Sequence, residues 1–137
     1  MKIIDKSSAI DEAYSLLKKL EAPACLFVHV KLVGEALEEI IGFLSEYNLP
    51  IDYNFARLGV VLHDAGKIIH SLEFSGPGNK HEAEGNLLLL ENEVAPELAQ
   101  CCISHAQYDG IDCSIEELLV ALSDSICKGT RVEKLEL

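Results

Sequence analysis

The segment Arg57-Leu-Gly-Val-Val-Leu-His-Asp-Ala-Gly-Lys67 joins an apolar run to an adjacent His-Asp pair, a glycine and a lysine. Histidine is the commonest side-chain ligand of transition metals, and carboxylates complete such sites and bridge between ions. The packing of a core does not by itself explain two metal-binding side chains at the end of an apolar run. The segment therefore predicts a helix that ends at a functional site containing His63 and Asp64.

Helical patterns continue on both sides of this segment, and little of the chain has strand character. Helix-capping signals and breakers divide the chain into expected helices. These run from Ser8-x-x-Asp11 to Leu20, Pro23 to about Tyr47, Asp52 to about Gly66, Asn79-x-x-Glu82 onward, Pro96 to Tyr108, Ser114-x-x-Glu117 to Gly129, and Thr130-x-x-Glu133 onward. Residues 71–79, with Gly76-Pro-Gly78, form the main irregular segment. The pattern predicts an all-α, single-domain bundle of about six to seven helices over residues 1–137.

Composition limits the classes of protein to consider. The chain has 137 residues, is 49% hydrophobic and 25% charged, and is therefore expected to form one soluble domain. No signal peptide or membrane-spanning run is present, so a cytoplasmic location is expected. A net charge of -12 counts against nucleic-acid binding but does not exclude a small phosphorylated substrate, because bound metal ions can invert the local potential. Five cysteines without a Cys-x-x-Cys spacing argue against a disulfide framework and against a thiolate zinc site.

Candidate metal ligands are spread over five of the expected helices. Four of the five histidines and two aspartates make up the candidate ligand set: His29, His63, Asp64, His81, His105 and Asp124. His29 and Asp124 lie on or beside apolar helix faces, where a polar group without a partner costs about 1–3 kcal/mol. The alternative is that each is an ordinary core or surface residue. That alternative is reasonable for one residue alone and disfavoured for all six together.

The order of these residues resembles the HD-domain superfamily of metal-dependent phosphohydrolases, all-α proteins named for their His-Asp pair. Leu62-His-Asp-Ala-Gly-Lys67 and Ala121-Leu-Ser-Asp124 are the specific matches, and the resemblance extends from about Pro23 to Arg131. It implies one metal ion held by His29, His63, Asp64 and Asp124. It also implies a second ion held by His81, His105 and a bridging Asp64. The chain lacks the Gly-Tyr-Pro signature of the cyclic-dinucleotide phosphodiesterases, which counts against a cyclic dinucleotide as the substrate.

The resemblance further implies catalytic roles for His63, Asp64 and Lys67, with Lys67 also placed to contact a substrate phosphate. Lys128 and Arg131 follow Asp124 at i+4 and i+7, which returns them near its helix face, and they are the other candidate substrate contacts. The alternative for these basic residues is a solvated charge near a helix end. A histidine-rich ligand set favours iron, manganese, cobalt, nickel or zinc over magnesium or calcium. One or two such ions are therefore expected, with two favoured.

The expected activity is hydrolysis of a phosphate ester or anhydride of a small substrate, with a nucleotide favoured. Two alternatives remain at this level: an HD-type diiron oxygenase, which uses the same kind of ligand set, and a non-catalytic HD module that senses a nucleotide or a metal. Neither nucleic acid nor a membrane is an expected partner. Homodimer formation is left open.

Overall fold

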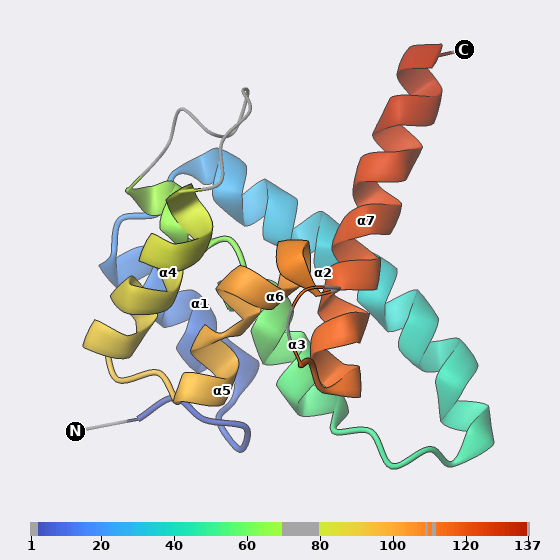
Figure 1. Ribbon diagram of the computed structural model, residues 1–137, viewed down its shortest axis with the longest axis horizontal. Coiled ribbons are helices and arrows are strands. Elements are labelled where there is room, and N and C mark those ends of the chain that lie inside the picture. The colour runs from blue at the N-terminus through green and yellow to red at the C-terminus, as the bar shows by residue number, and fades with distance from the viewer. Residues whose placement is uncertain (1–2, 70–79, 109, 111, 137) are drawn as a thin grey trace.

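The computed structural model describes residues 3–69, 80–108, 110 and 112–136, without the side chains of residues 80, 81 and 128–136 (Figure 1). The helices are α1 (Ile10–Lys19), α2 (Ala24–Leu44), α3 (Tyr53–Leu62), α4 (Lys80–Glu91), α5 (Pro96–Ala99), α6 (Cys101–Gln107) and α7 (Ile115–Glu136), with 3-10 turns η1 (Ser45–Tyr47) and η2 (Ala65–Ile68). Within the described ranges there is no strand, and only an isolated parallel bridge pairs Ile4 with Val94. The expected all-α fold is confirmed.

Side-chain caps define the starts of the two helices that matter most for the site. Asp52 is the N-cap of α3, and its Oδ1 accepts a hydrogen bond of 3.0 Å from the Phe55 backbone N–H. At the start of α7, Ser114 Oγ accepts from the Glu117 N–H and the Glu117 carboxylate accepts from the Ser114 N–H, both at 3.2 Å. This reciprocal pair is a capping box, as the sequence predicted.

Several helix boundaries differ from expectation. Helix α3 ends at Leu62 instead of at about Gly66, and the single helix expected from Pro96 to Tyr108 is divided at Gln100 into α5 and α6. The N-cap of α1 is Ala9, whose N–H donates to Glu12 Oε2, so the predicted Ser8/Asp11 capping box is wrong. The predicted break at Gly129 and new helix at Thr130 are also wrong, because α7 continues to Glu136. One glycine costs a helix only about 1 kcal/mol, and no proline follows it to enforce a stop.

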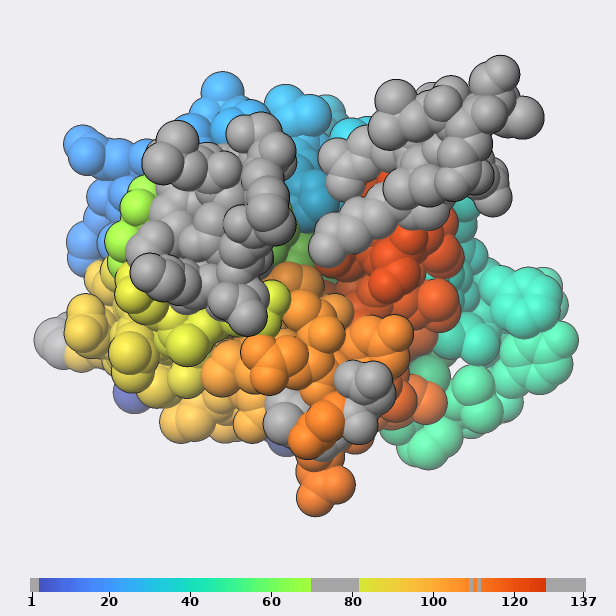
Figure 2. Space-filling view, turned by 45° about the horizontal axis from the view of Figure 1, so that its top comes forward, coloured from blue at the N-terminus to red at the C-terminus, as the bar shows by residue number. Residues whose placement is uncertain are grey.

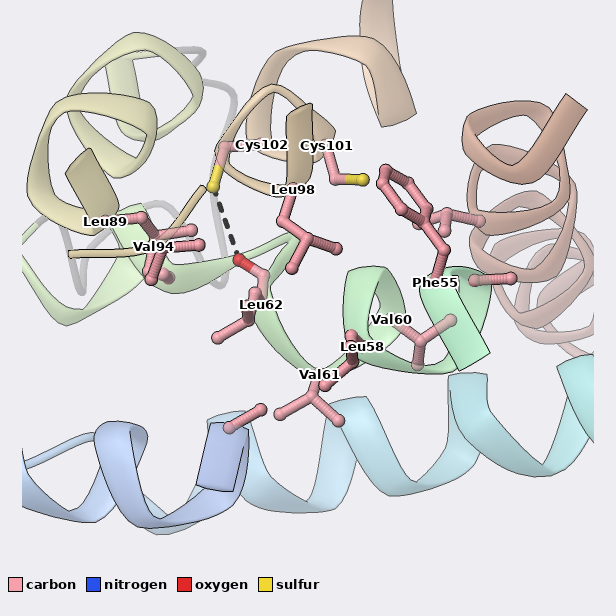
Figure 3. Close-up of a cluster of buried hydrophobic side chains, with 14 of the residues drawn as sticks. Phe55, Leu58, Val60, Val61, Leu62, Leu89, Val94, Leu98, Cys101 and Cys102 are labelled. Carbon is pink, nitrogen blue, oxygen red and sulfur yellow. Dashed lines mark hydrogen bonds between the residues drawn. The ribbon is translucent and has the colours of Figure 1, made fainter. Parts of the chain in front are cut away.

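Helix α3 lies at the centre of the molecule and packs against α1, α2, α5, α6 and α7 (Figure 1). Its side chains are buried almost all round, including Phe55, Leu58 and the run Val60 to Leu62. In Figure 3, Val61 points to the side of α3 opposite Leu98 and Cys101. A helix that is apolar on every face must be enclosed by other elements. The polar pair His63 and Asp64, directly after α3, is therefore placed inside the protein, 0% and 1% exposed.

The turn η2 after Asp64 is held closely against α4. A Cβ atom at Gly85 of α4 would lie only 2.7 Å from the Gly66 backbone nitrogen and 3.1 Å from Cys102 Sγ, so this contact requires glycine. All five cysteines are free thiols, as the sequence predicted. No described helix combines the length and apolar character needed to span a bilayer.

Candidate metal centre

Four predicted ligands converge from three parts of the chain. His29 lies near the start of α2, His63 and Asp64 directly follow α3, and Asp124 lies near the middle of α7. Each offers one ligand atom, and these atoms all lie within 4.8 Å of one another. The side chains of His29, His63, Asp64 and Asp124 are between 0% and 11% exposed. The structure thus brings together four of the six residues that the sequence singled out. They are the four that the resemblance assigns to a single metal ion.

The spacing of the ligand atoms suits one metal ion. His29 Nε2 lies 2.8 Å from Asp64 Oδ2 and 3.3 Å from Asp124 Oδ1. The same two oxygens lie 3.3 and 3.5 Å from His63 Nε2. Two ligand atoms that are each about 2.1 Å from an ion, at right or tetrahedral angles, are about 3.0–3.4 Å apart. Among the described residues, Nε2 of His29 and Nε2 of His63 are buried without a hydrogen bond of good geometry. Both atoms therefore suit coordination.

Backbone carbonyl groups orient two of the histidine rings. His63 Nδ1 lies 2.6 Å from the Val60 carbonyl oxygen, and His105 Nδ1 lies 2.9 Å from the Cys101 carbonyl oxygen. A carbonyl oxygen can only accept, so each Nδ1 carries the proton when the ring is neutral. The Nε2 lone pair of each ring then faces the cluster. This second contact is the usual way in which proteins orient a metal-binding histidine.

His105 lies on the other side of the Asp64 carboxylate. Its Nε2 is 3.4 Å from Asp64 Oδ1, whereas Asp64 Oδ2 faces His29 and His63. The rings of His63 and His105 meet nearly edge-on, with centroids 4.8 Å apart. Asp64 therefore directs one oxygen toward the four-ligand cluster and the other toward His105.

The charges of the cluster shift the pKa values of its members in different directions. Burial alone would lower the pKa of His63, but the Asp64 and Asp124 carboxylates outweigh it and raise the pKa to about 10. Burial and the neighbouring His63 lower the pKa of His105 to about 4. Burial would raise the pKa of Asp124, yet contacts with His29 and His63 bring it far below its usual range. The two carboxylates thus create a strong preference for positive charge, which a proton or a metal ion can satisfy.

Of the remaining predicted site residues, the structure describes some side chains and not others. Lys67, in η2, places Nζ 3.3 Å from Asp64 Oδ2, and its side chain is 12% exposed. His81 lies in the first turn of α4, and Lys128 and Arg131 lie in α7, but all three side chains fall outside the described part of the structure. His70, the one histidine that is not a candidate ligand, also falls outside the described residues.

Sequence reasoning missed the contribution of α6 to the supporting structure. The Cys102 thiol donates a hydrogen bond of 3.3 Å to the Leu62 carbonyl oxygen, the residue before His63 (Figure 3). The adjacent Cys101 carbonyl holds the ring of His105. No spacing signal in the sequence links these vicinal cysteines to Leu62.

Comparison with known proteins adds no relative: no protein-family model, curated protein or solved structure matches the chain. Fold and site define the class by themselves. The chain is an all-helical protein with a buried cluster of two histidines and two aspartates that could hold a metal ion.

Proposed function

We propose that the protein is a metal-dependent phosphohydrolase of the HD type, acting on a phosphate ester or anhydride of a small substrate such as a nucleotide. The observation that carries the proposal is the convergence of His29, His63, Asp64 and Asp124 on one buried point. Two imidazoles and two carboxylates suit manganese, iron, cobalt, nickel or zinc. A structural role alone would not require so many ionisable groups in a buried place, because each is costly to desolvate.

A second ion is part of the proposal. Asp64 Oδ1 and His105 Nε2 lie 3.4 Å apart on the side away from His29, which suits a carboxylate shared between two ions. His81 is the proposed third ligand there, because its helix α4 packs directly against η2. The proposed pair of sites thus uses all six residues of the predicted set.

A divalent ion held here supplies a Lewis acid that activates water at neutral pH and neutralises phosphate oxygens. The chain's own groups would orient the substrate. The Lys67 ammonium group, beside Asp64 and partly exposed, is proposed to bind a phosphate oxygen. Lys128 and Arg131 follow Asp124 along α7 at one and two turns and are proposed to extend this basic surface.

The test is reconstitution of the chelator-treated protein with each candidate metal, followed by metal counting and phosphate-release assays on nucleotides and model esters. We expect about two ions per chain and hydrolysis with at least one metal. Asp64→Asn keeps the shape of the side chain and should abolish both tight binding and turnover. Glu46→Gln removes an exposed carboxylate on η1 and is the matched control, with wild-type behaviour expected.

Two further variants separate the parts of the proposal. His105→Ala should reduce the metal count from two to one while leaving the His29/His63/Asp64/Asp124 site loaded. Lys67→Ala should leave the metal count unchanged and raise KM about 10-fold or more, the effect expected for loss of a charged hydrogen bond. Oxygen consumption by the reduced iron protein without hydrolysis would instead establish the oxygenase chemistry. Nucleotide binding without turnover across all metals would establish a sensing module.

A further inference from the structure

Helix α2 is apolar on two faces, and only one of them is buried. The buried face packs on the core and consists of Leu26, Val30, Val33, Leu37 and Ile41. On the other face, Phe43 is 64% exposed, and its ring contacts that of Tyr47, 59% exposed, at a centroid distance of 5.7 Å. A helix with apolar residues on both sides is normally covered on both sides.

Helix α7 presents a second apolar stripe beside this face. Its large aliphatic side chains that are 43–49% exposed are Ile115, Leu118, Leu122 and Ile126. Their spacing of three, four and four residues keeps them on one side of a helix. In Figure 2 the end of α2 lies at the edge of the molecule next to α7. Between the two helices runs an open groove of about 520 Å³, lined by Ala36, Glu39, Ile40, Phe43, Leu44, Leu119, Leu122 and Ile126.

We propose that this surface, called here the α2–α7 face and made up of the groove with Tyr47, Ile115 and Leu118, is the interface of a homodimer. The charge distribution favours a second copy as the occupant. The chain carries a net charge of -12, so two copies repel each other across most of their surfaces. The groove is poor in charge: among the side chains that the structure describes, Glu39 is the only charged one that lines it. A second copy can therefore approach here with the least repulsion.

The exposed area matches what a stable dimer needs. The aromatic side chains of Phe43 and Tyr47 expose on the order of 130 Å² each, and the four aliphatic side chains of the α7 stripe expose on the order of 80 Å² each. The exposed apolar area is therefore roughly 600 Å² in all. This is at the upper limit of the apolar patches that monomers usually expose, about 300–600 Å². Homodimer interfaces are about two-thirds apolar, so the patch corresponds to about 900 Å² per subunit. Standard stable interfaces bury about 800 Å² per subunit.

The shape of the face suits twofold pairing. In a twofold interface the same patch serves both subunits, so a protruding group on one copy must meet a hollow on the other. Phe43 protrudes at the end of the groove, and Ala36 is the small residue among the α2 side chains that line it. Phe43 of each copy can thus enter the groove of the other, and the α2 and α7 helices of both copies would form a four-helix layer.

The experiment measures the mass of the full-length protein by sedimentation and light scattering from about 1 µM to about 100 µM. We expect a species of twice the chain mass of 15.0 kDa. Phe43→Glu and Leu122→Glu, made separately, should each weaken the dimer by about 30-fold or more, as loss of a central apolar contact does. The control is Leu87→Glu, which changes a residue 56% exposed on α4 and should leave the dimer intact.

Circular dichroism of each variant shows whether the monomer remains folded, and Phe43 and Leu122 are exposed enough for a folded variant to be expected. A wild-type protein of 15.0 kDa at the highest concentration would overturn the proposal. A dimer that resists both Phe43→Glu and Leu122→Glu, or one broken equally by Leu87→Glu, would also overturn it. The inference does not rest on the proposed phosphohydrolase activity.

Discussion

Replacing Gly85 by alanine should destabilise the protein by displacing the turn that follows the His63-Asp64 pair. The new Cβ would meet the Gly66 nitrogen at 2.7 Å, the Gly66 Cα at 3.0 Å and Cys102 Sγ at 3.1 Å. Carbon atoms in contact normally lie about 3.5–4.0 Å apart. Two of the three atoms belong to the backbone of η2 and cannot rotate away, so α4 and η2 must separate.

The expected magnitude follows from two opposing effects. Overpacking a core costs about 1–3 kcal/mol, and a clash with backbone belongs at the upper end of that range. Replacing glycine by alanine inside a helix by itself raises the unfolding free energy by about 1 kcal/mol. The net loss of unfolding free energy is therefore about 1–2 kcal/mol, or about 4–8 °C in Tm for a domain of this size.

Thermal and urea unfolding of Gly85→Ala measure this loss, and Gly42→Ala is the matched control. Gly42 also lies in a helix, but nothing comes within 4 Å of a Cβ placed there, so alanine should stabilise by about 0.5–1 kcal/mol. Metal affinity should fall in Gly85→Ala alone, because Gly66 lies two residues after Asp64. An increase in Tm for Gly85→Ala equal to that of Gly42→Ala would refute the reasoning.

Three other measurements test the described contacts. Asp52→Ala removes the cap of α3 and should lower the unfolding free energy by about 1 kcal/mol in urea titrations; an unchanged midpoint would show that the Phe55 N–H finds another acceptor. In the metal-free protein the pKa of His63 is raised to about 10, so its stabilising contribution is complete below pH 6.5 and is lost as pH rises through 10. Tm should therefore fall over that interval, and His63→Gln should flatten the fall; parallel curves for both proteins would contradict it. A thiol reagent at pH 8 should modify exposed Cys25 quickly and buried Cys101 and Cys102 only on unfolding, because burial raises the pKa of both thiols; fast labelling of all three would disprove that.

Local sequence patterns predicted the helices well where the deciding contacts are local. Asp52 and the Ser114/Glu117 pair mark the starts of α3 and α7, because a cap involves residues only three positions apart. The same reasoning failed at Gly129, where a weak breaker was read as a stop. It also failed at Ser8, whose Oγ accepts from the Asp5 N–H instead of capping α1. Competing local partners of similar energy cannot be ranked from spacing alone.

The sequence by itself determined an all-α chain and the identity of the candidate ligands, because both follow from periodicity and from the chemistry of single residues. Only the tertiary structure decided that His29, His63, Asp64 and Asp124 meet within 4.8 Å. Those residues come from three helices, and the distances between them depend on how α2 and α7 pack around α3. The supporting contacts of Cys102 with Leu62, and the close approach at Gly85, arise in the same way. Such contacts join residues far apart in the chain, so no local pattern encodes them.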